Sequence, residues 1–116
     1  MAGTLEVTED LCWMPAGWVF DTILERVAGV LYTKDPAFAE MLLAVRTDTS
    51  GGYLDLRDMP LETLGIVLDA AHIAYSHMER EDVAGFAAPE FYAGCLTQFQ
   101  QLLDILRVGQ HARLQQ

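Results

Sequence analysis

An aspartate, a histidine and a serine share one face of a predicted helix. Asp69, His72 and Ser76 stand three and four residues apart, a spacing that places their side chains on one side of an α-helix. An acid, an imidazole and a hydroxyl are the parts of a nucleophilic triad. Side chains of one helix diverge outward, however, and no sharp turn or oxyanion-hole segment accompanies the serine. We therefore interpret them as a polar strip on a mostly buried helix, and we assign no catalytic residues.

The histidines and cysteines do not form a metal-binding pattern. His72 and His77 are five residues apart, which is about 140° around a helix, so they do not converge on one ion. Cys12 and Cys95 are the only cysteines, they lie far apart, and each has apolar neighbours. Two cysteines alone cannot make a structural zinc site. We expect two reduced, buried thiols, no metal and no cofactor.

Carboxylates gather in the turn-rich segments, close to aromatic residues of the kind enriched at protein interfaces. A glycosidase-like pair of acids would need one carboxyl whose pKa is raised by burial, and these segments are polar. The alternative is an acidic recognition patch near the start of the third helix. The residues that we expect to contact a partner are Asp48, Tyr53, Asp55, Asp58, Glu62 and Phe86.

The overall charge restricts the kinds of partner. Seventeen acids oppose seven lysines and arginines, for a formal net charge of −10. A surface this negative repels nucleic-acid phosphates and anionic lipid headgroups, and it attracts basic proteins. Acidity for solubility is the simpler explanation of the charge taken alone. No apolar run reaches the ~18–20 residues of a membrane span, and the N-terminal residues do not resemble a secretory signal. We expect a cytoplasmic protein.

Apolar residues recur every three and four positions in four segments, which predicts four amphipathic helices. Hydrophobic residues make up 52% of the 116 residues, enough to build a core. The third helix is the most apolar and is expected at the centre. Gly109 is expected to end the fourth helix, and residues 1–4 and 110–116 are expected to fray. The predicted helices are about Gly17–Tyr32, Pro36 to just before Thr47, Pro60 to just before Arg80, and Ala88–Val108.

A short extended element accompanies the helices. Residues 53–56 alternate in part between apolar and polar, and residues 5–7 are the plausible pairing partner. Residues 4–14 also suit a turn of helix because of their acidic cluster, so both interpretations stay open. The predicted fold is mainly α: residues 1–116 form a single, four-helix bundle-like domain with a short two-stranded element.

One stretch of twelve residues resembles a family of known proteins. Residues 53–64 combine an extended Asp-Leu-x-x-Met lead-in, Asp55 to Met59, with a helix that begins at Pro60 and carries Glu62 in its first turn. The stretch is similar to small uncharacterised bacterial proteins, among them some immunity proteins of toxin systems. The resemblance implies a small acidic cytoplasmic protein that binds and blocks a cognate toxin, and it carries no residue roles.

Three hypotheses of function follow. The first is a non-enzymatic acidic domain that binds a basic protein, with toxin immunity as its sharpest form. The second is a homo-oligomeric structural or scaffold protein that buries its apolar surplus between subunits. The third is a small-molecule binder or enzyme that uses the strip around Asp69 and His72.

Overall fold

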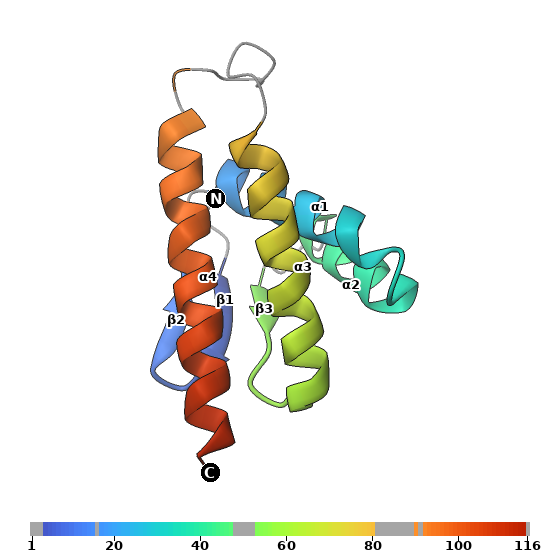
Figure 1. The fold of residues 1–116 in the computed structure, drawn as a ribbon, viewed down its shortest axis with the longest axis vertical. Helices are drawn as coiled ribbons and strands as arrows, with labels where there is room; N and C mark the ends of the chain where they lie inside the picture. Colours follow the sequence, from blue (N-terminus) through green and yellow to red (C-terminus); the bar gives the residue numbers. More distant parts are fainter. Residues whose placement is uncertain (1–3, 16, 48–52, 81–89, 91, 116) are drawn as a thin grey trace.

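Four helices and a small sheet make up the fold in the computed structural model (Figure 1), which describes residues 4–15, 17–47, 53–80, 90 and 92–115. The mainly helical prediction is confirmed. In chain order the elements are β1 (Thr4–Thr8), β2 (Leu11–Trp13), α1 (Gly17–Leu31), α2 (Pro36–Thr47), β3 (Tyr53–Asp55), α3 (Leu61–Glu79) and α4 (Tyr92–Leu114).

The sheet has the strand order β2-β1-β3. β1 pairs with β3 in parallel, with Leu5 opposite Leu54, so the predicted pairing of these segments is confirmed. The sheet also has a third strand that was not predicted, because β2 adds an antiparallel partner to β1, with Leu5 opposite Trp13. The Trp13 indole Nε1 donates a hydrogen bond to the Gln98 carbonyl at 2.9 Å, which fastens β2 to α4.

Local sequence explains where α2 begins and how α3 is held at its end. The Asp35 carboxylate accepts a hydrogen bond from the Phe38 N–H at 3.0 Å, and Pro36 occupies the first helical position. At the C-terminal end of α3, the buried Tyr92 hydroxyl donates a hydrogen bond to the Met78 carbonyl. This bond satisfies one of the carbonyls that the end of α3 leaves without an intrahelical partner.

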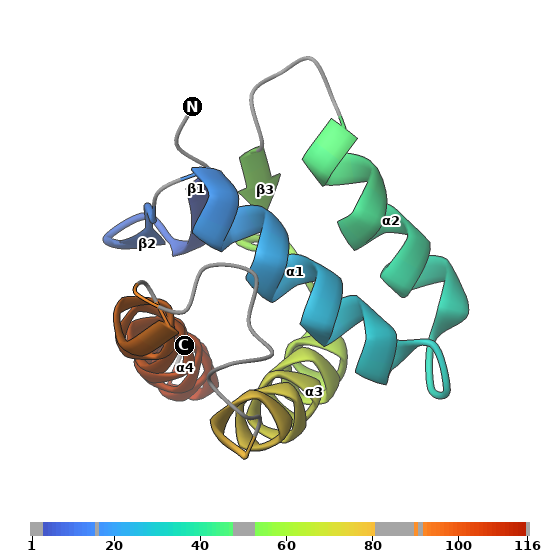
Figure 2. The ribbon, with the colours of Figure 1, turned by 90° about the horizontal axis from the view of Figure 1, so that it is seen from above.

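The helices and the sheet enclose one apolar core. α3 and α4 run side by side in opposite directions, and α3 also packs against α1 (Figure 1). Viewed along α3 and α4, α1 runs across their direction and α2 lies beside α1, away from α4 (Figure 2). The sheet contributes Leu5, Val7 and Leu54 to the same core cluster as Phe20 and Phe99.

The chain ends differ from the expectation. α4 continues through Gly109 to Leu114, so the predicted helix end at Gly109 and the predicted fraying of residues 110–114 are wrong. Gly109 is buried against Val7 of β1, where a Cβ would overlap the valine side chain. The glycine therefore serves close packing rather than helix termination. Thr4 belongs to β1 and does not fray, whereas residues 1–3 and 116 lie outside the described residues.

Candidate functional site

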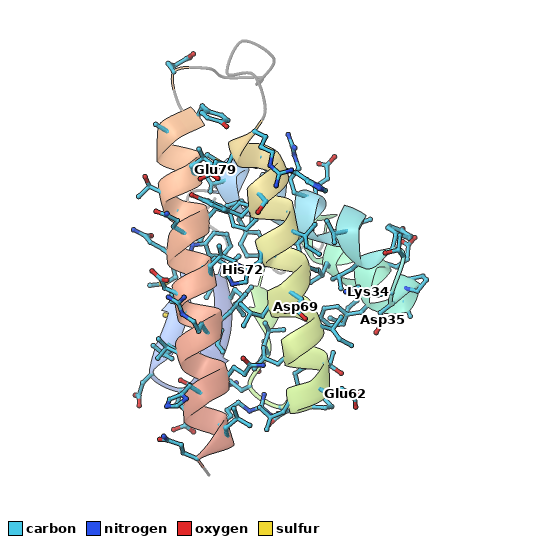
Figure 3. All side chains as sticks on the ribbon, viewed as in Figure 1. Lys34, Asp35, Glu62, Asp69, His72 and Glu79 are labelled. Atoms are coloured by element: carbon cyan, nitrogen blue, oxygen red, sulfur yellow. The ribbon has the colours of Figure 1, made fainter. Side chains whose placement is uncertain are left out.

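The residues expected to contact a partner are only partly within the described residues. Asp48 and Phe86 lie outside them, and Tyr53 belongs to β3 but its side chain is not among those described. Asp55, Asp58 and Glu62 are exposed at the connection from β3 into α3. Figure 3 shows Glu62 near the beginning of α3, at the same end of the molecule as the C-terminal end of α4.

An open hollow lies at this end of the molecule. It has a volume of about 690 Å³, and we call it the end hollow. Three segments form it: the end of β1 with its turn into β2, the loop between β3 and α3, and the last turn of α4 (Figure 1). Its lining residues are Val7, Thr8, Glu9, Asp10, Arg57, Asp58, Ala112 and Arg113.

Strand direction explains why these segments meet. β1 and β3 are parallel neighbours, so the residues that follow them leave the sheet at the same edge. Glu9 and Asp10 follow β1, and Arg57 and Asp58 follow β3. The close contact of Gly109 with Val7 then carries the last turn of α4, with Arg113, to that edge.

Arg57 is held in place by two neighbouring carboxylates. Its Nε and Nη2 donate to the two oxygens of Asp55 at 2.9 and 2.8 Å, and its backbone N–H donates to Asp55 Oδ1 at 3.0 Å. Its Nε also lies 3.3 Å from Glu6 Oε2. These hydrogen bonds from Arg57 lower the pKa of Asp55 to about 2. The guanidinium is thus fixed at the wall of the end hollow and is largely neutralised.

Arg113 is in a different situation. Its Nη1 is buried and has no hydrogen-bond partner within the described part of the chain. A buried charged donor without an acceptor is unfavourable by roughly 1–3 kcal/mol or more. Arg113 lies in the last turn of α4, where a positive charge is favoured by the helix dipole. The dipole makes the position tolerable for a cation but does not supply the missing acceptor.

Three exposed carboxylates complete the end hollow. Glu9 and Asp10 occupy the turn between β1 and β2, and the Asp10 N–H donates to Thr8 Oγ1 at 3.3 Å, which helps to shape that turn. Asp58 faces the same hollow from the loop before α3. Among the described residues, no three His, Cys, Asp or Glu side chains lie close enough to hold a metal ion. The arrangement suits positively charged groups of a larger ligand.

The polar strip of α3 is not assembled as a triad. Figure 3 shows Asp69 and His72 on α3. Asp69 and His72 are exposed and Ser76 is half-buried, and within the described part of the chain no hydrogen bond joins the three side chains. His72 alone of the three lines a second hollow between α3 and α4, with a volume of about 360 Å³. The other lining residues of this second hollow are Tyr75, Gln100, Leu103, Asp104 and Arg107.

Three of the residues that line the second hollow already have partners within the protein. Arg107 Nη2 donates to Asp104 Oδ1 at 2.6 Å. Tyr75 packs edge-on against Phe99 with the ring centroids 5.4 Å apart. Burial and the nearby Glu79 carboxylate raise the pKa of the Tyr75 hydroxyl, so it remains protonated at neutral pH.

Both cysteines are free, but only one is buried. Cys95 lies in the core, and burial raises the pKa of its thiol. The expectation that Cys12 is buried is wrong, because Cys12 is exposed on β2 between two inward-facing residues. Alternation along a strand places neighbours on opposite faces, so Leu11 and Trp13 turn inward and Cys12 turns outward.

Sequence reasoning did not identify Arg57 and Arg113 as site residues. Arg57 lies between Asp55 and Asp58 in the sequence, and this position could have indicated an ion pair. Arg113 was assigned to a frayed tail because Gly109 was taken as the end of the helix. If the helix continues beyond Gly109, basic residues lie in its last turn, where the helix dipole favours them. This was the sequence signal that could have identified Arg113.

The described residues contain no helix that combines the length and the apolar character needed to cross a bilayer. The chain matches no protein-family model, no curated protein and no solved structure.

Proposed function

We propose that this protein is a non-enzymatic acidic binding domain, and that its end hollow receives a basic segment of a protein partner. The observation that carries the proposal is the gathering of Glu9, Asp10 and Asp58, from two separate loops, around one hollow of about 690 Å³. This volume lies within the usual range for ligand sites, roughly 300–1,000 Å³.

Charge supports a basic partner over other classes. The net charge of −10 steers positively charged proteins toward the surface and repels nucleic acids. Glu62 extends the negative surface beyond the end hollow into the first turn of α3, whereas the charge of Asp55 is balanced by Arg57. Steering of this kind accelerates encounter, whereas the shaped hollow supplies specificity.

Neutralisation of a toxin is the most specific version of this proposal. The stretch that resembles bacterial immunity proteins, residues 53–64, includes Arg57 and Asp58, which line the end hollow. A bound partner would thus contact the segment that carries the resemblance. A cytoplasmic location, where such a protein would meet its toxin, is part of the proposal. Co-expression with the products of neighbouring genes, followed by copurification, would identify the partner.

Binding of a labelled arginine- and lysine-rich peptide, followed by fluorescence anisotropy, tests the site. The site variant combines Glu9→Gln, Asp10→Asn and Asp58→Asn. Each exposed ion pair contributes about 0.5 kcal/mol, so we expect roughly tenfold weaker binding.

A matched control removes the same charge from exposed positions on α1, on α3 and before α4. It combines Asp21→Asn, Asp69→Asn and Glu90→Gln. We expect this control to weaken the peptide by less than about threefold through the loss of long-range attraction alone. Equal weakening by both triple variants would show that the peptide responds to net charge, and the proposed site would then be wrong.

A small-molecule binder using the α3 strip is the second candidate, and one observation favours it: His72 lines the second hollow. That hollow is the smaller of the two, and its Asp104 and Arg107 already form an ion pair. NMR shifts of the His72 ring on addition of a metabolite mixture, abolished in His72→Ala, would support this candidate.

Homo-oligomerisation remains the third candidate. Met14, which follows β2, and Met41 on α2 are exposed apolar side chains, with 67% and 42% of their surface accessible. They are separate positions rather than one patch, and scattered apolar residues are common on monomers. Light scattering at high concentration distinguishes a monomer from an oligomer.

A further inference from the structure

We propose that the basic segment of the partner binds as an additional strand along the free edge of β2, with its basic end in the end hollow. This inference rests on the proposed function and specifies how the partner chain is held. In the strand order β2-β1-β3, β2 pairs with β1 along one edge, and no described strand lies along its other edge. Figures 1 and 2 both show β2 at the outer side of the sheet.

The backbone groups of Cys12 point toward this free edge. The N–H of Leu56, just after β3, donates to the Glu6 carbonyl at 2.8 Å, so the hydrogen-bonding groups of Glu6 are directed at β3. Glu6 is the residue of β1 opposite Cys12, which makes these two a non-hydrogen-bonded pair of the antiparallel ladder. The N–H and C=O of Cys12 therefore face away from β1, toward the position of an added strand.

The edge of β2 is exposed and is held in place before a partner arrives. Cys12 and Met14 are exposed whereas Trp13 and Pro15 are buried, so the alternation of a strand continues past the end of β2. β2 itself contains no charged residue and no proline, which are residues that commonly prevent pairing at a sheet edge. The hydrogen bond from the Trp13 indole to the Gln98 carbonyl fixes β2 against α4.

Charge selects the occupant of this edge. Glu9 and Asp10 occupy the turn directly before β2, and Asp58 lines the same end hollow. The other end of β2, at Trp13 and Met14, is apolar. A strand along β2 therefore meets carboxylates at one of its ends. A second copy of this chain, with its net charge of −10, is repelled there, whereas a basic segment is attracted.

The arginines of the end hollow leave it negative overall. Arg57 is balanced by Asp55 through two side-chain hydrogen bonds. The charge of Arg113 remains, but three carboxylates line the same hollow. The field at the end of β2 therefore favours cationic groups.

The position of the acids predicts the direction of the added strand. Antiparallel pairing is slightly more stable per residue than parallel pairing. The C-terminal end of an antiparallel strand lies beside the start of β2, where Glu9 and Asp10 are located. We therefore expect a partner segment in which uncharged β-forming residues come first and arginine or lysine residues follow. Addition of a peptide strand to a sheet edge is a recurrent mode of recognition, with affinity supplied by main-chain hydrogen bonds.

Three labelled peptides with uncharged, blocked ends test the inference. The forward peptide has alternating valine and threonine residues followed by arginines, because valine and threonine favour a strand. The methylated peptide has the same sequence, but its valine and threonine backbone nitrogens carry methyl groups and cannot donate. The reversed peptide has the arginines first. Fluorescence anisotropy measures the binding of each peptide.

Two variants of the protein change the free edge without changing its charge. Cys12→Pro removes the outward N–H and places the proline ring on the free edge, where it interrupts no hydrogen bond between β1 and β2. Cys12→Thr is the matched control, because it keeps the N–H and threonine suits a strand. Thermal melting establishes that each variant is folded.

The natural sequence should bind the forward peptide at least about fivefold more tightly than the methylated peptide, which is the factor that one net hydrogen bond contributes. Cys12→Thr should keep that ratio. Cys12→Pro should bind both peptides with nearly equal affinity, close to that of the methylated peptide. The reversed peptide should bind the natural sequence at least about threefold more weakly than the forward peptide, because its arginines lie away from the acids.

The contrary results separate this inference from the proposed function. Equal binding of the forward and methylated peptides to the natural sequence would overturn strand addition, and this comparison stands even if proline unfolds its variant. If the triple site variant still weakened both peptides, the acidic site would remain. Equal binding of the forward and reversed peptides would overturn the antiparallel direction. A dimer in light scattering that Cys12→Pro converts to a monomer would show that a second copy covers the edge, and would overturn the inference. Failure of all three peptides to bind would overturn the proposed function itself.

Discussion

Replacement of Gly109 by alanine tests how α4 is placed against the sheet. A Cβ at this position would lie well within 3.0 Å of Val7 Cγ1, 3.3 Å from Val7 Cβ and 3.7 Å from Thr8 Cγ2. Carbon atoms pack best about 3.5–4.0 Å apart, so α4 and β1 would have to separate by roughly an ångström. Val7 is fully buried at 0% exposure and its β-branched side chain has few rotamers, so it cannot turn aside.

The net effect is a difference between two opposing terms. Overpacking a core costs about 1–3 kcal/mol, and the buried position of Val7 places this contact in the upper part of that range. Alanine is favoured over glycine within a helix by about 1 kcal/mol. We therefore expect Gly109→Ala to reduce the free energy of unfolding by about 1–2 kcal/mol, and to lower Tm by about 4–10 °C.

Gly94→Ala is the matched control, because it makes the same chemical change in the same helix where a Cβ would meet nothing within 4 Å. We expect Gly94→Ala to raise stability by about 0.5–1 kcal/mol. Urea unfolding followed by circular dichroism measures both variants. In a Val7→Ala background the penalty of Gly109→Ala should shrink by at least about 1 kcal/mol. Equal stabilisation by the two alanines would refute the close contact of α4 with β1.

Three further predictions concern capping, thiol accessibility and pH. Asp35→Ala should cost about 1 kcal/mol in urea unfolding by removing the cap of α2, and an unchanged midpoint would contradict that role. Under native conditions a thiol reagent should modify exposed Cys12 quickly and buried Cys95 only after unfolding, and rapid reaction of both would contradict the packing. Because Arg57 lowers the pKa of Asp55 to about 2, below its ordinary 3.8, this pair stabilises the fold above about pH 4 and loses its effect as the pH falls toward 2. Both groups are largely exposed, so we expect the loss to be below 1 kcal/mol and absent in Asp55→Asn, as measured by urea unfolding across that pH range.

Local chemistry was enough to predict the helices and one strand pairing. Asp35 followed by Pro36 marks a helix start wherever it lies in the fold, and α2 begins there. The pairing of residues 5–7 with 53–56 was predictable because an isolated strand needs a partner and the chain offered one candidate. The four-helix bundle-like arrangement stays a prediction, since helix propensity does not specify how helices cross.

Gly109 shows where local reasoning failed. A glycine after an amphipathic stretch is typical of a helix end, and it is equally typical of close packing between two elements. Only the position of Val7, about a hundred residues earlier in the chain, distinguishes the two meanings. The prediction that Cys12 is buried was wrong for a related reason, because its exposure depends on whether residues 11–13 form a strand or a helical turn.

The candidate site was predictable in its acids but not in its shape. Asp55, Asp58 and Glu62 were selected because acidic loops beside a helix start are exposed, and these three are exposed. The assembly of Asp58 with Glu9, Asp10 and Arg113 depends on the parallel pairing of β1 with β3 and on the length of α4. The sequences of the loops alone predict neither the parallel pairing nor the length of α4.

The same glycine links the packing of the core to the proposed binding. Val7 and Thr8 form one wall of the end hollow and Ala112 and Arg113 another, and Gly109 is the point where these walls touch. A Gly109→Ala variant that moves α4 by roughly an ångström should also move Arg113 relative to Asp10. Well below its Tm, this variant should therefore bind the labelled arginine- and lysine-rich peptide more weakly than the natural sequence does, while Gly94→Ala should bind it unchanged. Unchanged peptide binding by a destabilised Gly109→Ala variant would mean that the peptide is bound independently of the contact between α4 and β1. The end hollow would then not be the unit that binds the partner.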